Sequence, residues 1–302
     1  MQAFAPGIYP RSEQLVQATR DFDRGRTTRE AVDERVRRDL DELVAVQQDA
    51  GLDLLTDGLL TWQDHFRPIV EASEGLEPGA LTRFLDTNTF YRAPHGTTAT
   101  PALSAPLDDP YVAPLPGPRV ATLPSPYALA DGTGVEVQTI ASRVLKPQLD
   151  ALDAELVVFA EPFLARHEPF DVGDLAKAFE ALAGGPKIAL WLVFGDARNA
   201  FEMGLADLPV DAIGVDFYAT HLTDVPKGLD KLLLAGVVDA RSARVEDPRE
   251  LAEFAQRLQQ DREIEQIALV PNGDLQFVSE PVARQKLQRL GAAKTATVEA
   301  AA

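Results

Sequence analysis

Polar side chains follow most of the apolar runs in this 302-residue chain, at the points where those runs end. If the runs are parallel strands, these polar groups meet at one edge of a sheet. Carboxylates gathered there can bind an amine, a sugar hydroxyl or a hard metal ion, or act as acid and base. The alternative is that they cap the next helices or pair with nearby arginines such as Arg67 or Arg241. The residues concerned are Arg11, Ser12, Asp57, Ser125, Glu161, Asp196, Asp216, His221, Asp239, Asn272 and Asp274.

Several familiar catalytic signatures are absent from the sequence. The chain has no cysteine, which excludes disulfides, thiolate metal sites and a cysteine nucleophile. Its four histidines stand alone rather than in the His-x-His or His-x-x-x-His pairs of metal sites. Gly132-Thr133-Gly134 lacks the later glycine and lysine of a phosphate loop, and no Gly-x-Ser-x-Gly occurs. We therefore expect no Ser-His-Asp triad and no bound metal.

The composition narrows the classes of partner. A net charge of −18 would repel nucleic-acid backbones and anionic membranes, so we expect neither as a partner. No apolar run approaches the ~20 residues of a membrane span, and no signal peptide is visible. These features predict a soluble cytoplasmic protein that acts on a small molecule, with a hydrophobic content of 45% that is ample for one large core.

The apolar runs alternate with amphipathic helical patterns along most of the chain. Residues 187–196 are the clearest case, because glycines bound this apolar run on both sides. Such a run is typical of a strand buried on both faces of a parallel sheet. Eight β/α units predict a closed (β/α)8 TIM barrel that forms a single domain over residues 1–292. The eight predicted strands are residues 3–10, 52–56, 119–123, 156–160, 187–196, 212–215, 232–238 and 267–270.

Residues 82–118 interrupt the alternation between the second and third predicted strands. The β-prone residues at 83–91 predict a hairpin or an excursion strand, and the dense prolines over 94–126 argue against regular helix. This excursion is either a plain surface feature or a loop that covers the substrate. The Ala/Thr-rich residues 293–302 are predicted to form a disordered tail.

Short segments spread over nearly the whole chain share residues, in the same order, with one known family. Asp-Thr-Asn-Thr-Phe-Tyr at residues 86–91 is similar to that family's Asp-Thr-Asn-x-x-Tyr. The ordered set resembles the catalytic C-terminal barrel of cobalamin-independent methionine synthase, in the methionine synthase/uroporphyrinogen decarboxylase-like superfamily. The other segments are residues 6–12, 51–58 with Asp64, 161–162, 236–239 with Ser242, Val245 and Glu246, and 271–275.

The resemblance implies transfer of a methyl group from a methylfolate to homocysteine, with a zinc ion that activates the thiol. The family's zinc ligands are a histidine, two cysteines and a glutamate, and they fall here on Trp191, Val193, Gly273 and Asp216. Two acids that hold homocysteine become Leu59 and Ala160. We therefore expect that the zinc site is lost and that a folate remains as the co-substrate.

Three hypotheses follow. The first is a methyltransferase that lacks the family zinc and relies on an accessory protein for what is missing. The second is a metal-free lyase-type enzyme that uses Arg11, Asp57 and His221. The third is a non-catalytic paralogue in which Trp191 and Leu59 form an apolar floor for a ligand. The predicted catalytic residues are Asp216, Asp239 and His221, and the predicted substrate-binding residues are Arg11, Ser12, Asp57, Asp64, Glu161, Trp191, Asn272 and Asp274.

Overall fold

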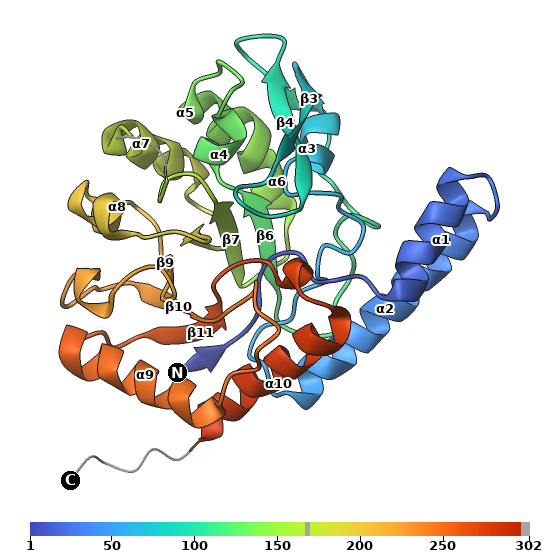
Figure 1. The fold of residues 1–302 in the computed structure, drawn as a ribbon. Coiled ribbons are helices and arrows are strands. Elements are labelled where there is room, and N and C mark those ends of the chain that lie inside the picture. The colour runs from blue at the N-terminus through green and yellow to red at the C-terminus, as the bar shows by residue number, and fades with distance from the viewer. Residues whose placement is uncertain (167–169, 297–302) are drawn as a thin grey trace.

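A curled parallel sheet forms the centre of the computed structural model, which describes residues 1–166 and 170–296. Seven strands pair in the order β1-β11-β10-β9-β8-β7-β6, and helices lie outside them (Figure 1). The strands carry almost only buried residues, as expected of a parallel sheet covered on both faces. Their bounds are β1 (Gln2–Ala3), β6 (Val120–Pro124), β7 (Leu156–Glu161), β8 (Lys187–Leu192), β9 (Ala212–Asp216), β10 (Leu232–Val238) and β11 (Ile267–Pro271).

One of the eight predicted strands, residues 52–56, is not formed as a strand. Of the predicted strand 3–10, only Ala3 belongs to a strand, in β1. A complete (β/α)8 barrel is therefore not confirmed. Residues 52–57, hereafter the seam segment, lie between β1 and β6 and make one isolated bridge, from Leu55 to Arg119. Side chains take the place of the missing ladder: Asp53 Oδ2 accepts the Ala3 amide at 2.7 Å, and Gln47 bonds both the N–H and the C=O of Thr56. Backbone bonds from Asp53 to Ala3 and from Leu55 to residue 118 hold the segment in place.

The chain between the seam segment and β6, which includes the predicted excursion of residues 82–118, lies outside the sheet. It contains α3 (Arg67–Glu71), β2 (Ser73–Glu74), β3 (Leu76–Arg83), β4 (Phe90–Gly96) and β5 (Ala102–Leu103). The antiparallel pair β3–β4 is the predicted hairpin, and it is longer than residues 83–91 because β3 begins at Leu76. No helix or strand occurs from residue 104 to residue 119, in agreement with the dense prolines.

Two helices precede the seam segment and form an arm. Ser12 caps α1 (Glu13–Asp23) and Thr28 caps α2 (Arg29–Asp49), each by accepting an amide three residues on. Gly51, with φ +67°, follows the end of α2 in the left-handed conformation that favours glycine. Figure 1 shows α1 against the far half of α2, away from the sheet.

The remaining helices follow their strands in chain order. A π-helical turn, η1 (Ile140–Leu145), separates α5 (Val137–Thr139) from α6 (Lys146–Ala151), in which Pro147 stands at the N-terminal end. The last helix continues to Thr295, into the predicted tail, and residues 297–302 lie outside the described residues. None of the described helices combines the length and apolar character that a membrane crossing needs. The other elements are α4 (Pro126–Ala130), α5 (Val137–Thr139), α6 (Lys146–Ala151), α7 (Val172–Leu182), α8 (Arg198–Glu202), η2 (Leu205–Asp207), η3 (Leu222–Asp224), α9 (Pro248–Arg262), η4 (Leu275–Phe277) and α10 (Glu280–Thr295).

Candidate functional site

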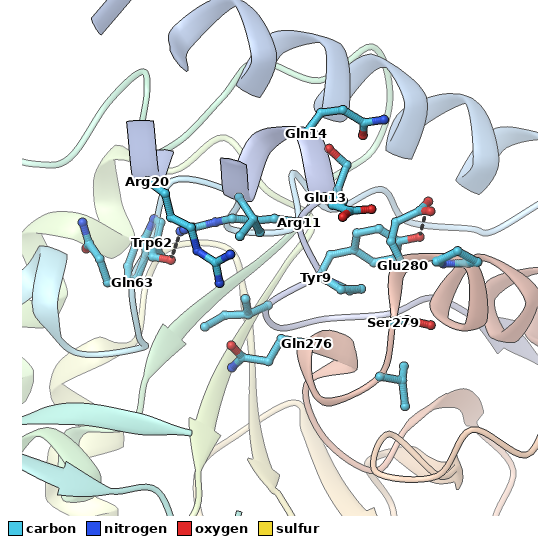
Figure 2. Close-up of a pocket in the computed structure, with 16 residues that line it drawn as sticks. Tyr9, Arg11, Glu13, Gln14, Arg20, Trp62, Gln63, Gln276, Ser279 and Glu280 are labelled. Atoms are coloured by element: carbon cyan, nitrogen blue, oxygen red, sulfur yellow. Dashed lines mark hydrogen bonds between the residues drawn. The ribbon is translucent and has the colours of Figure 1, made fainter. Parts of the chain in front are cut away.

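A pocket of about 900 Å³, hereafter the mouth pocket, opens at the carboxyl end of the sheet beside the ends of β1 and β11 (Figure 2). Three separate parts of the chain line it: residues 8–16 with Arg20, residues 62–63, and residues 276–281. Ligands of barrel proteins bind at this end of the strands, so the location agrees with the edge predicted from the sequence. Its labelled side chains are Tyr9, Arg11, Glu13, Gln14, Arg20, Trp62, Gln63, Gln276, Ser279 and Glu280.

Arg11 lines the mouth pocket but is already engaged. Its Nε donates to the carbonyl of Leu60 at 2.7 Å and its Nη2 donates to the carbonyl of Trp62 at 2.6 Å. Burial lowers the pKa of this guanidinium, and the Asp39 carboxylate opposes that effect. Ser12 is bound to Asp39 through both its amide and its hydroxyl. Both residues therefore fix the wall of the pocket, where the sequence had predicted substrate contacts.

Arg20 is the free cation of the mouth pocket. Its exposed side chain extends into the pocket from α1 (Figure 2), and within the described residues it has no hydrogen bond or ion pair. Amide side chains from other elements, Gln63 and Gln276, line the same space. The pocket thus presents one unpaired guanidinium together with groups that both donate and accept hydrogen bonds. Sequence reasoning missed Arg20 because it lies on a helix rather than at a strand end.

Asp274 is buried at the end of β11 and pairs with a histidine that the sequence did not single out. His65 Nε2 lies 2.9 Å and 2.8 Å from the two Asp274 oxygens, and the Ile8 amide donates to Oδ1 at 2.9 Å. Burial alone would lower the pKa of His65, but the Asp274 carboxylate outweighs it, so this pKa is raised. The other ring nitrogen of His65 is buried without a partner among the described residues.

Asp216 and Asn272 were predicted to lie together, and they do. Asn272 Nδ2 donates to Asp216 Oδ1 at 3.0 Å, and the Asn272 side-chain oxygen accepts the Ala240 amide at 2.9 Å. Both side chains are fully buried, and burial raises the pKa of Asp216. The second Asp216 oxygen has no partner within the described residues.

Glu161, at the end of β7, is fully buried beside Ser125. One carboxyl oxygen bonds the Ser125 hydroxyl, and the other accepts the amides of Phe163 at 2.7 Å and Leu164 at 3.0 Å. Burial raises the pKa of Glu161 to about 7, against the opposing effect of these hydrogen bonds. Glu161 was predicted to bind substrate, but both of its carboxyl oxygens bond to groups inside the protein.

Two further predicted acids hold loops. Asp57 forms a buried ion pair with Arg119 at 3.0 Å and accepts the Leu59 amide, and burial raises its pKa despite that partner. Asp64 accepts two amides at the start of α3, at 2.8 Å each, and the Arg92 amide of β4 at 3.2 Å. These contacts are those of loop-fixing and helix-capping residues.

Asp239 and His221 do not meet in the structure. Asp239 accepts the Arg241 amide at 2.9 Å, and its own amide donates to Glu246. His221 is exposed and caps η3, with Nδ1 2.7 Å from the Thr223 hydroxyl. Among the described residues, no hydrogen bond or ion pair links His221 to Asp216 or Asp239.

Another buried pair, which was also missed, joins the β10–α9 loop to α10. Lys286 has a fully buried side chain, and its Nζ bonds the two Glu246 oxygens at 2.9 Å and 3.0 Å. Glu246 also accepts a bond from the Tyr218 hydroxyl at 3.3 Å. Burial and the Glu246 charge raise the pKa of Tyr218.

Trp191 and Phe194 fill the interior of the sheet at its carboxyl end. Trp191 is fully buried, and a Cβ at Gly214 would lie 2.3 Å from its ring. A Cβ at Gly273 would lie 2.1 Å from the ring of Phe194. The space around the end of β8 is therefore occupied by aromatic rings.

The curled sheet of seven parallel strands, with polar residues and a large pocket at the carboxyl ends of the strands, defines an α/β protein with a half-barrel sheet. A model of the family "Cobalamin-independent synthase, N-terminal domain" matches residues 136–263. The 5-methyltetrahydropteroyltriglutamate–homocysteine methyltransferase of Mycobacterium bovis is 31% identical over 79% of this chain and 37% of its own length. That of Mycobacterium leprae is 28% identical over 59% of this chain and 26% of its length.

Solved structures agree with this assignment at the level of the fold. A B12-independent methionine synthase from Shewanella sp. W3-18-1 has a TM-score of 0.66 at 17% identity, over 89% of both chains. A putative one from Listeria monocytogenes has a TM-score of 0.65 at 16% identity, over 99% of both chains. The family recognition from the sequence is confirmed: this chain is a relative of the cobalamin-independent methionine synthases.

The match to this family covers only part of its members. The family model describes the N-terminal domain, whereas the segments compared above resemble the C-terminal barrel. The chain spans about a third of the length of the curated relatives, with 37% in the case of the Mycobacterium bovis protein. The specific likeness to the C-terminal barrel therefore stays a prediction.

Proposed function

We propose that this chain is a methionine-synthase-type methyltransferase barrel that binds a methylfolate-type donor in the mouth pocket, for transfer of the methyl group to a thiol such as homocysteine. The observation that carries the proposal is Arg20, which has no hydrogen bond or ion pair among the described residues and lines a pocket of about 900 Å³ on a member of this family. A folate presents carboxylates that suit a guanidinium, and a heterocycle whose donors and acceptors suit the amides of Gln63 and Gln276.

The family zinc does not fit the residues present, which supports a barrel without that metal centre. Trp191 and Val193 offer no ligand atom to a metal at the mouth, and the Phe194 ring excludes any side chain at Gly273. Among the described residues, no group of three or more His, Cys, Asp or Glu side chains could hold a metal ion.

Thiol activation must then come from elsewhere. A thiol with a pKa of ~8.5 is mostly protonated at neutral pH and is a weak nucleophile without a metal or cationic neighbour. We propose that an accessory protein supplies this activation, while this chain binds and orients the donor. In that arrangement Arg11 holds the pocket walls in place and Arg20 contacts the donor's carboxylates.

Equilibrium dialysis of the purified protein against increasing concentrations of 5-methyltetrahydrofolate measures donor binding. We expect saturable binding that weakens about tenfold in Arg20→Ala, as a lost charge-assisted hydrogen bond predicts. Arg37→Ala is the matched control, because Arg37 is an exposed arginine on α2 outside the pocket. Absence of saturable binding, or equal binding by the Arg20 variant, would contradict the proposed site.

Methyl transfer itself needs a separate assay. Homocysteine and 5-methyltetrahydrofolate are supplied to the protein with and without extract from the source cells, and methionine is measured. If no combination yields methionine above extract lacking the protein, methyl transfer is wrong even where donor binding holds.

No specific observation favours the two alternatives. The three residues of the lyase hypothesis are separately engaged: Arg11 by carbonyls, Asp57 by Arg119, and His221 by Thr223. The apolar floor of the binding hypothesis is closed, because Trp191 and Leu59 are both buried.

A further inference from the structure

The tip of the β3–β4 hairpin reaches two arginines at the carboxyl end of the sheet. Asp86 Oδ1, from the tip, lies 3.2 Å from Arg241 Nη1 and 3.7 Å from Arg166 Nη2. Arg166 belongs to the loop after β7 and Arg241 to the loop after β10. A single carboxylate oxygen from outside the sheet thus serves two guanidinium groups that come from separate loops.

One residue, Phe194, positions both guanidinium groups. The Arg241 guanidinium lies 4.6 Å from the centroid of the Phe194 ring. Arg166 donates two hydrogen bonds to the Phe194 carbonyl, from Nε at 3.0 Å and from Nη2 at 2.6 Å. Phe194 is buried and has φ +55°, a strained conformation for a bulky residue that persists only where its surroundings enforce it. The two cations are therefore held in place before any ligand arrives.

The hairpin does not depend on Asp86 for its attachment. Phe84 stacks on Phe277 with ring centroids 6.1 Å apart and meets Tyr91 edge-on at 5.9 Å. By contrast, the Asp86 side chain is 65% exposed, and ion pairs this exposed contribute little to stability. Asp86 is thus a carboxylate that another anion could replace.

We propose that Arg166 and Arg241 form a binding site for the anionic group of a small molecule, a carboxylate or a phosphate, which Asp86 occupies in the absence of ligand. Planar guanidinium groups suit both anions. Asp239, whose carboxylate accepts the Arg241 amide, belongs to the same loop after β10 as Arg241. The site is separate from the mouth pocket, because the residues that line that pocket do not include Asp86, Arg166 or Arg241.

Binding of inorganic phosphate and of glutamate, measured by calorimetry at constant ionic strength, tests the proposal without any folate. In Asp86→Asn the internal competitor is removed, so we expect affinity to rise about two- to fivefold. In Arg241→Gln we expect a loss of about tenfold or more. Asp196→Asn, an equal charge change at another exposed position that follows β8, should leave affinity unchanged.

Each outcome decides one point. Tighter binding of one anion only, in the Asp86 variant, supports the site and identifies its ligand as a phosphate or a carboxylate. Unchanged or weaker binding in that variant, or no binding of either anion by both the parent and the variant, overturns the proposal. Because Asp86 is mostly exposed, its variant keeps the fold and the result is readable even if Arg166→Gln or Arg241→Gln is unstable.

Discussion

The ring of Phe194 occupies the space that any side chain at position 273 would need. A Cβ there would lie 2.1 Å, 2.4 Å and 2.5 Å from three atoms of that ring. The glycine is therefore required by close packing rather than by its backbone conformation. The same contact leaves no room for the cysteine side chain that the family resemblance would place at position 273.

Gly273→Ala should destabilise the protein by about 1–3 kcal/mol, as overpacking in a dense core does. In a Phe194→Ala background the added methyl group meets empty space, so the same change should cost almost nothing. Urea unfolding of the two single variants and the double variant measures this coupling. Additive losses would show that the clash is relieved in some other way.

Asn272→Ala should cost about 2–4 kcal/mol, because it removes a hydrogen bond from buried Asp216 and leaves the Ala240 amide without an acceptor. The matched control is Asn199→Ala, at an exposed position on α8, where we expect a change within about 0.5 kcal/mol. Denaturant midpoints at pH 7 compare the two variants. Equal midpoints would contradict a stabilising role for the Asp216–Asn272 pair.

Glu161 should make stability depend on pH. Its pKa rises from 4.5 in the unfolded chain to about 7 in the folded protein, so the folded state holds the proton more tightly. The stabilisation is full below pH ~4.5 and is lost as the pH rises towards 7, by roughly 3 kcal/mol. Glu161→Gln mimics the protonated acid and should flatten this part of the profile, which unfolding at closely spaced pH values would show. An unchanged slope in the variant would assign the dependence to other groups.

Lys286→Met should cost about 3–5 kcal/mol, since it leaves the Glu246 carboxylate buried without its cation. Adding Glu246→Gln removes that charge and should recover much of the loss. Thermal unfolding of the single and double variants measures the recovery. A double variant no more stable than Lys286→Met would mean that the pair acts through packing alone.

Apolar runs were enough to predict most strands, because a strand buried on both faces carries little else. Residues 52–56 were also predicted to form a strand from their apolar residues, but they do not. The side chains of Asp53 and Gln47 accept the amides of Ala3 and Thr56, which a strand ladder would otherwise pair. That exchange depends on three-dimensional placement and leaves no periodic signal.

The candidate site shows a similar division. Asp216 and Asn272 were predicted at one end of the sheet, and the structure brings them into contact. His65, 209 residues from its partner Asp274, could not be inferred from spacing. His221 was predicted to be catalytic from its place at the rim of the sheet. In the structure it instead caps η3 and contacts the hydroxyl of Thr223, two residues further along the chain.

The seam segment carries one more consequence, through Arg11. This side chain follows β1 and grips carbonyls of Leu60 and Trp62, just past the point where the strand ladder is interrupted. Residues 8–16, which precede the seam segment, and residues 62–63, which follow it, both line the mouth pocket, so we expect a bound molecule to link these two parts of the chain. Part of the binding free energy would then be used to hold these two parts of the chain together, and only the remainder would appear as affinity. A substitution at Asp53 or Gln47 would weaken binding without altering any residue that the ligand touches.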